Sequence, residues 1–219
     1  MILDKENELF EKWAKGRIGF VSDGIIDEDS YIASDIKILF ILKEVNDAGG
    51  GNWDLRTFVS NGARTHTWNN ITRWTMGIRS IEREIYWDEI ETISKEQREK
   101  YLKSIGAINL KKTPGDYVCY GDELNRIAKE DSLYLKEQIS LYDADLIICC
   151  GTSDVYHSVF EEQVKWKRTN RGVWYHELKE GKYLISYVHP EARVGANILY
   201  YGLIDAIKEI KNREVHRGL

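Results

Sequence analysis

The sequence predicts an α/β fold: a three-layer sandwich around a central, mostly parallel four-stranded sheet, with a hairpin in the C-terminal half. Three short apolar runs, at residues 36–42, 105–110 and 146–150, have the continuous hydrophobicity of strands buried on both faces. Helical patterns separate these runs along the chain. Short buried strands that alternate with helices are typical of a parallel sheet covered by helices on both sides.

Local patterns predict the individual elements. An acidic, amphipathic helix over residues 3–14 opens the chain, and residues 1–35 are expected to form a helical extension of a single domain, 1–219. Ser94 and Gln97 form a capping box that begins another helix. In chain order we then expect strand 36–42, helix 68–83, helix 94–102, strand 105–110, helix 122–141, strand 146–150, a helix after residue 152, the hairpin strands 173–178 and 183–188, and helix 197–211.

The charge is small in total but unevenly distributed. The chain has 219 residues and a formal net charge of −5. Residues 1–35 carry 4 basic and 9 acidic side chains, whereas residues 36–79 carry 6 and 3, and residues 161–219 carry 11 and 8. Two positive stretches therefore remain for a basic face, which keeps DNA as an expected partner.

Other function classes are disfavoured by composition. No run of about 18 apolar residues is present, so we expect no membrane span. The chain's three cysteines, Cys119, Cys149 and Cys150, lack the paired spacing of zinc ligands. Vicinal Cys149 and Cys150 lie in an apolar run and are expected to be reduced core thiols, as in a cytoplasmic protein. We expect a monomer without a metal or other cofactor.

Ligands bind beyond the carboxyl ends of the strands in such sheets, so the loops there carry the candidate chemistry. Glu44, Asn46 and Asp47 follow the first apolar run, where a carboxylate or amide can orient a water molecule. Gly49 and Gly50 would let the backbone approach a ligand closely. The alternative is a hydrophilic turn without chemistry, because Gly, Asn and Asp are common in turns.

Two further loops carry candidates for binding and catalysis. Asn109 ends the second strand, and its amide can read a planar ring through one donor and one acceptor, or simply cap the loop. His189 follows the last strand and can stabilise a developing oxyanion or act as an acid, or it can fix the turn. The chain has only two prolines, Pro114 and Pro190, and they lie in these two loops.

Aromatic and basic residues suggest a nucleic-acid ligand. Trp53 and Phe58 are expected to stack a base, whereas Trp68 and Trp74 fit a helix core better. A segment with four cations and no acid is expected to contact phosphates, although a solvated loop is an equal alternative. The expected DNA contacts are Lys165, Lys167, Arg168 and Arg171 in this segment, with Arg193, Lys111, Lys112, Thr152 and Ser153 in the loops.

Taken together, four blocks resemble the uracil-DNA glycosylase superfamily in their order and spacing. They are Ile-Leu-Phe-Ile-Leu-Lys-Glu-Val-Asn-Asp (38–47), Ala-Ile-Asn-Leu-Lys-Lys-Thr-Pro-Gly (107–115), Leu-Ile-Ile-Cys-Cys-Gly-Thr-Ser (146–153) and the hairpin with its His-Pro motif (171–193). The layout is most similar to the bacterial and archaeal iron–sulfur branch. The chain lacks that branch's four cluster cysteines, so we expect no iron–sulfur centre.

The resemblance implies a DNA glycosylase that flips a base out of the duplex and hydrolyses its N-glycosidic bond. Glu44 matches the catalytic Glu of the iron–sulfur branch, whereas a slip of one residue matches Asn46 to the Asn of the mismatch-specific branch. Asn109 would then read the base, and His189 would stabilise the leaving base. Because the first motif departs from the family pattern, the expected substrate is a modified pyrimidine, such as glucosylated hydroxymethylcytosine of phage DNA, or uracil.

Two alternatives remain open from the sequence. The first is a non-catalytic protein on the same fold that binds nucleic acid or a partner protein, which the degenerate first motif favours. The second is an α/β enzyme that processes free nucleotides or nucleosides, which predicts no salt-dependent affinity for DNA.

Overall fold

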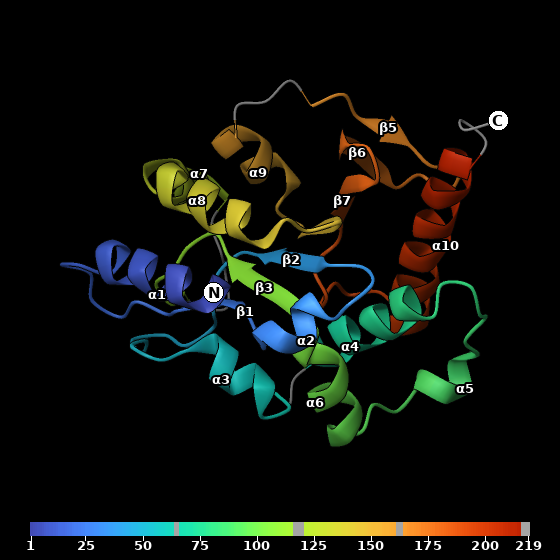
Figure 1. Cartoon of the computed structure of the whole chain (residues 1–219), viewed down its shortest axis with the longest axis horizontal. Helices are drawn as coiled ribbons and strands as arrows, with labels where there is room; N and C mark the ends of the chain where they lie inside the picture. The colour runs from blue at the N-terminus through green and yellow to red at the C-terminus, as the bar shows by residue number, and fades with distance from the viewer. Residues whose placement is uncertain (64–65, 116–120, 161–163, 216–219) are drawn as a thin grey trace.

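The computed structural model describes residues 1–63, 66–115, 121–160 and 164–215 (Figure 1). It confirms the α/β class, with a single mixed sheet of seven strands in the order β1-β3-β2-β4-β7-β6-β5. The strands are β1 (Gly24–Ile25), β2 (Ile38–Leu42), β3 (Ile105–Asn109), β4 (Leu146–Cys150), β5 (Lys167–Arg168), β6 (Trp174–Lys179) and β7 (Lys182–Tyr187).

The sheet is larger than the predicted four strands because both of its edges are extended. β3, β2, β4 and β7 are parallel neighbours and form its centre. β1 is added antiparallel to β3, and β6 and β5 are added antiparallel beyond β7. β1 and β5 have two residues each, too few to show an alternating pattern, so only their pairing defines them as strands.

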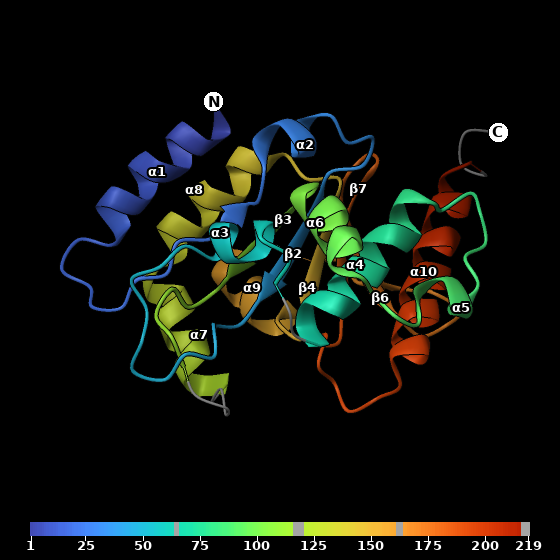
Figure 2. The same cartoon turned by 90° about the horizontal axis from the view of Figure 1, so that it is seen from below.

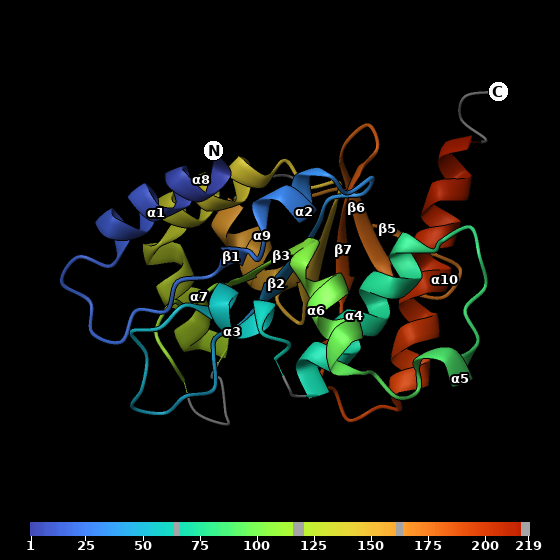
Figure 3. The ribbon, with the colours of Figure 1, turned by 60° about the horizontal axis from the view of Figure 1, so that its bottom comes forward.

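Helices cover both faces of the sheet. They are α1 (Ile2–Trp13), α2 (Glu28–Ile32), α3 (Leu55–Ser60), α4 (His66–Arg79), α5 (Trp87–Ile90), α6 (Lys95–Lys103), α7 (Gly121–Glu130), α8 (Ser132–Tyr142), α9 (Ser153–Phe160) and α10 (Ala196–Val215). In Figure 2, α1, α7, α8 and α9 lie on one side of the central strands, and α4, α6 and α10 lie on the other. Figure 3 shows α10 running alongside the β5–β7 edge.

Alternation along each central strand explains this three-layer arrangement. On β2, Ile38, Phe40 and Leu42 belong to the apolar cluster under α4 and α10. Leu39 and Ile41 belong to the cluster under α1, α8 and α9. Successive side chains of a strand point to opposite faces, so a strand that is apolar throughout needs a helical layer on each side.

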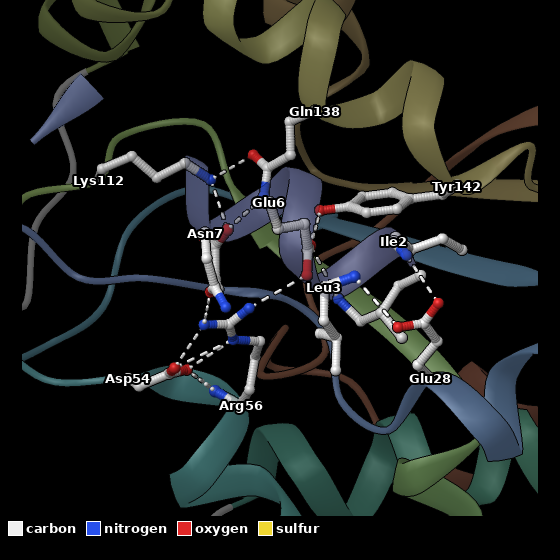
Figure 4. A network of polar contacts seen from close by, with 12 residues as sticks. Ile2, Leu3, Glu6, Asn7, Glu28, Asp54, Arg56, Lys112, Gln138 and Tyr142 are labelled. Atoms are coloured by element: carbon white, nitrogen blue, oxygen red, sulfur yellow. Dashed lines mark hydrogen bonds and ion pairs between the residues drawn. The ribbon is translucent and has the colours of Figure 1, made fainter. Parts of the chain in front are cut away.

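The N-terminal segment is part of the fold rather than an appended extension. β1 pairs with β3, and α1 packs on α8 through apolar side chains and the buried carboxylate of Glu6 (Figure 4). Glu6 accepts a hydrogen bond from the Tyr142 hydroxyl and pairs with Arg56 at 3.1 Å. Burial raises the pKa of Glu6 to about 7. A carboxylate with this many partners fixes the register of α1 on the core.

Two helical predictions can be compared directly with the structure. The Ser94 capping box is confirmed: the Ser94 hydroxyl accepts from the Gln97 N–H, and the Gln97 side chain accepts from the Ser94 N–H. The single helix expected over residues 122–141 is instead two helices, α7 and α8, which meet at Asp131. Asp131 is buried and pairs with Arg17. Within the described residues, no helix is both long and apolar enough to cross a membrane.

Candidate active site

A cavity of about 770 Å³ opens at the carboxyl ends of the central strands. It brings together seven residues that the sequence suggested for catalysis or base contact: Glu44, Asn46, Asp47, Trp53, Phe58, Asn109 and His189. Lys43, Val45, Thr67, Trp68 and Glu191 are also among its lining residues. We call it the main cavity. Pro114 and Pro190 both lie in loops at this edge of the sheet, as expected from parallel strands.

The loops that follow β2 and β3 form one wall of the main cavity and remain paired beyond the sheet. The Lys111 N–H donates to the Lys43 carbonyl at 2.9 Å. After a turn, the Gly115 N–H donates to the Val45 carbonyl at 2.9 Å, and the Asp47 N–H donates to the Gly115 carbonyl at 3.3 Å. Backbone hydrogen bonds therefore hold the segment that carries Glu44, Asn46 and Asp47.

Glu44 is held by a cation that also comes from the β3 loop. Its carboxylate Oε2 lies 2.6 Å from Lys111 Nζ, and its side chain is only 7% exposed. Burial opposes the charge on Lys111, but the pKa of Lys111 is raised because Glu44 and Glu123 accept from it. Glu44 Oε1 has no hydrogen-bond partner among the residues that the structure describes. This oxygen is free to accept from a water molecule.

Asp47 makes its hydrogen bonds within its own loop. Its Oδ2 accepts from Trp53 Nε1 at 2.8 Å and from the Gly51 N–H at 2.9 Å. These hydrogen bonds lower the pKa of Asp47 below its usual value. Asp47 therefore positions Trp53, and its carboxylate is less available for water than that of Glu44.

The glycines predicted to approach a ligand serve this loop instead. Neither Gly49 nor Gly50 lines the main cavity. A Cβ on Gly50 would lie 2.0 Å from the Asp47 carboxylate, and Gly49 has a φ of +76°, which favours glycine. Only Gly50 makes a close approach, and it is to the protein's own chain, whereas a Cβ on Gly49 would meet nothing within 4 Å.

Trp53 and Phe58 form an aromatic wall. Their ring centroids are 6.0 Å apart in an edge-to-face arrangement, and Phe58 is 43% exposed. Phe58 belongs to α3, which Asp54 caps by accepting from the Arg56 N–H. A large aromatic residue that stays exposed beside a cavity is typical of a surface that stacks a planar ligand.

Asn109 lines the main cavity and is bonded to a buried ionic cluster. The Asp23 carboxylate accepts from the Asn109 N–H at 2.7 Å, from Lys112 Nζ at 2.6 Å and from Gln138 Nε2 at 2.9 Å. Lys112 and Asp23 are fully buried, and burial lowers the pKa of Lys112 although Asp23 opposes this. The cluster, part of which appears in Figure 4, holds the end of β3 in place.

His189 presents one defined donor. Its Nδ1 accepts from the Glu191 N–H at 3.1 Å, so the proton of the neutral ring is on Nε2. Burial lowers the pKa of His189, Glu191 opposes the shift, and the charge of Lys43 adds to it. A lowered pKa keeps the ring neutral at pH 7, with Nε2–H as a hydrogen-bond donor.

The loop that carries His189 is anchored on α4. Asn70 Nδ2 donates to the Pro190 carbonyl at 2.7 Å, and Arg73 Nη1 donates to Asn70 Oδ1 at 2.7 Å. The Glu191 carboxylate accepts from the Thr67 N–H at 3.2 Å. Pro190 is therefore one of several restraints that aim His189, and the others come from α4.

The predicted DNA contacts fall into three groups. Lys165, Arg168, Arg171 and Arg193 are exposed, whereas Lys167 pairs with Glu177, and Ser153 shares a hydrogen bond with Ser186. Lys111 is occupied by Glu44. Lys112 and Thr152 lie inside the protein, and the Thr152 hydroxyl donates to the Ile41 carbonyl. Their burial removes Lys112 and Thr152 from the candidate DNA contacts.

Sequence patterns missed several residues that build this site. Asp23 lies in a segment without periodicity, so no local signal links it to Asn109. The sequence predicts that Lys111 and Lys112 are both exposed basic residues, and only the register of the sheet determines which of them is buried. Trp68 was expected in a helix core; it is buried, and it also lines the main cavity.

Comparisons with known proteins give no family for this chain. No family model matches it, and no curated protein matches it. The resemblance to the uracil-DNA glycosylase superfamily therefore stays a prediction from the four sequence blocks.

Proposed function

We propose that the protein is a DNA glycosylase that hydrolyses the N-glycosidic bond of a flipped nucleotide. One observation carries the proposal: a single cavity at the carboxyl ends of parallel strands contains Glu44, Asn109 and His189 beside the Trp53–Phe58 wall. These groups supply a water-orienting carboxylate, a ring-reading amide, a neutral donor and a stacking surface. The combination suits hydrolysis of a bond between a sugar and a planar base.

The base enters the main cavity and stacks on the aromatic wall. Asn109, which is 2% exposed and anchored by Asp23, reads one donor and one acceptor at the edge of the ring. The volume of about 770 Å³ lies in the upper part of the range of small-molecule sites, about 300–1,000 Å³. Room remains for a ring substituent, which favours a modified pyrimidine over unmodified uracil.

The C1′–N bond breaks through an oxocarbenium-like sugar, and its electron pair stays on the base. His189 Nε2–H donates to the oxygen on which the negative charge of the leaving base develops. Glu44 Oε1 orients the water that adds to C1′ and accepts its proton, while Lys111 holds the other oxygen. The proton taken by Glu44 then passes through water to the departing base anion, which regenerates the carboxylate and leaves an abasic site and the neutral free base.

The test is strand cleavage by alkali after incubation with DNA that carries uracil, hydroxymethylcytosine or glucosylated hydroxymethylcytosine. We expect an abasic product from at least one of these substrates with the wild-type protein. Glu44→Ala should abolish it and His189→Ala should slow it by about 10²–10³, and both should leave DNA affinity nearly unchanged. His157→Ala, which removes an exposed histidine of α9 outside the main cavity, is the matched control.

The remaining outcomes separate the alternatives. DNA binding without an abasic product from any substrate would favour a non-catalytic binding protein. The Asp47 carboxylate, which accepts two hydrogen bonds within its own loop, is consistent with that alternative. Turnover of free nucleosides without salt-dependent DNA affinity would favour a nucleoside-processing enzyme.

A further inference from the structure

A second cavity adjoins the main cavity. It has a volume of about 580 Å³ and lies at the carboxyl ends of β4 and β7, between the first turns of α7 and α9 and the start of β6. Its lining includes Lys43, Asp122, Gly151, Ser153, Asp154 and Trp174. Of these residues only Lys43 also lines the main cavity, so Lys43 stands at the boundary between the two spaces.

The ammonium group of Lys43 is available for an anion. Among the described residues no carboxylate pairs with it, unlike Lys111, which is held by Glu44. The Lys43 Cε lies 3.8 Å from the position that a Cβ on Gly151 would take, and the backbone nitrogen of His189 lies 3.6 Å from the same position. Gly151 therefore leaves open the point where Lys43, the β4 end and the His189 loop converge.

The second cavity has the chemistry of a nucleoside site. Trp174 is 45% exposed and gives a face on which a base can stack. Asp122 and Asp154 are acceptors for the amino groups of base edges. Carboxylates repel phosphate, which places the anionic part of a ligand at the Lys43 end of this cavity.

The path from the second cavity continues into the basic segment. Arg168 pairs with Trp174 between β5 and β6, and its guanidinium carbon lies 5.5 Å from the centre of the Trp174 ring. Arg168 is exposed, as expected for a residue that contacts phosphate. One strand of nucleic acid can thus run from the main cavity past Lys43 and Trp174 to Arg168.

We propose that the second cavity binds the nucleotide next to the flipped one, and that Lys43 binds the phosphate between them. The proposal rests on the proposed function, because the main cavity must hold a nucleotide. It assigns Lys43, Trp174 and the two carboxylates to binding and gives them no part in bond cleavage. The ligand class is single-stranded or locally unpaired DNA.

The test measures binding separately from excision. A short fluorescein-labelled single strand carries one target pyrimidine on a 2′-fluoroarabinose, a sugar that resists formation of an oxocarbenium ion. Each phosphate in turn is replaced by an uncharged methylphosphonate, and affinity is measured by fluorescence anisotropy over a range of salt concentrations. The proteins are the wild type, Lys43→Met, Lys43→Arg, and the control Lys15→Met, which removes an exposed charge outside both cavities.

We expect Lys43→Met to reduce the slope of log affinity against log salt by about 0.7, the value for one phosphate of a single strand. One methylphosphonate beside the target should weaken wild-type binding and leave Lys43→Met unaffected, and Lys43→Arg should restore the wild-type pattern. Trp174→Ala should weaken binding about tenfold, whereas Tyr86→Ala, at another exposed aromatic residue, should not.

Equal slopes of log affinity against log salt for Lys43→Met and Lys15→Met would overturn the proposal. So would a methylphosphonate series in which no phosphate shows a dependence on Lys43, or a wild-type protein that does not bind the strand. The Lys43 signature in a protein that excises no base would support this site and reject the glycosylase activity. Excision of a base by a protein in which Lys43→Met does not change the salt dependence would support the glycosylase activity and reject the second site.

Discussion

Lys111 and Lys112 are neighbours in the chain, yet they belong to two regions of opposite character. Lys112 belongs to the interior: its side chain is 0% exposed, and Asp23 and Gln138 accept hydrogen bonds from its ammonium group. Lys111 holds one oxygen of Glu44, a residue that lines the main cavity, while the other oxygen stays available. A buried cluster whose charges are paired and hydrogen-bonded stabilises one conformation, whereas a hydrogen-bond acceptor left open beside a cavity can take part in chemistry.

The largest expected effect breaks the buried cluster. Asp23→Asn removes the charge that compensates Lys112, and an unpaired buried charge typically costs about 3–5 kcal/mol of stability. Urea denaturation measures the change. The control Asp143→Asn affects an exposed carboxylate paired with Lys179 and Lys182 and should cost at most about 1 kcal/mol. Similar losses for the two variants would contradict the distinction between the regions.

Next in size is the loss of the donor in the main cavity. His189→Ala should lower the excision rate by about 10²–10³, the usual effect of removing one donor from a developing anion. The free energy of unfolding should change far less than for Asp23→Asn, because His189 is only partly buried. Single-turnover kinetics on the best substrate, with His157→Ala as control, give the rate. A rate within a few-fold of wild type would exclude this role for His189.

A smaller effect is expected from the aromatic wall. Trp53→Ala removes a stacking face, which typically costs about 1–3 kcal/mol of binding per base. The loss should appear in the affinity for single-stranded DNA. The wall includes Phe58, so Phe58→Leu should show a weaker loss of the same kind. Unchanged affinity in both variants would place the base elsewhere.

The last effect is a pH dependence that belongs to the buried region and is spread over a range of pH, so that it is small for any single step in pH. The pKa of Glu6 is about 7 in the folded protein and 4.5 for the free side chain, so between these values the native state holds a proton that the unfolded state has lost. Stability should therefore fall as pH rises from about 4.5 to about 7, by at most about 1.4 kcal/mol per pH unit, and Glu6 should contribute no further change above that window.

Paired unfolding curves for Glu6→Gln isolate this contribution. The difference between wild type and Glu6→Gln should change across the window, whereas the exposed Glu8→Gln should give a difference that does not depend on pH. A flat difference for Glu6→Gln would mean that Glu6 is already ionised in the fold.

The same contrast explains how much the sequence could predict. The four central strands and the hairpin were predictable because continuous burial leaves a local apolar signal, and β4 matches its predicted range. The gathering of Glu44, Asn109 and His189 also followed, since parallel strands end at one edge. Which lysine is buried depends on the β3 register, and Asp23 joins Asn109 only through a contact 86 positions apart in sequence. No local pattern encodes either fact.

The pairing of the segment after β2 with the segment after β3 limits how this site can evolve. Residues 43–47 and 111–115 share backbone hydrogen bonds, so the two segments keep a fixed register and each side chain keeps a fixed partner across it. A single inserted residue in one segment would turn Glu44 away from Lys111 and bring its neighbour into the cavity. Descendants of this chain would therefore acquire new substrates by substitution at constant length, or by lengthening both segments in step.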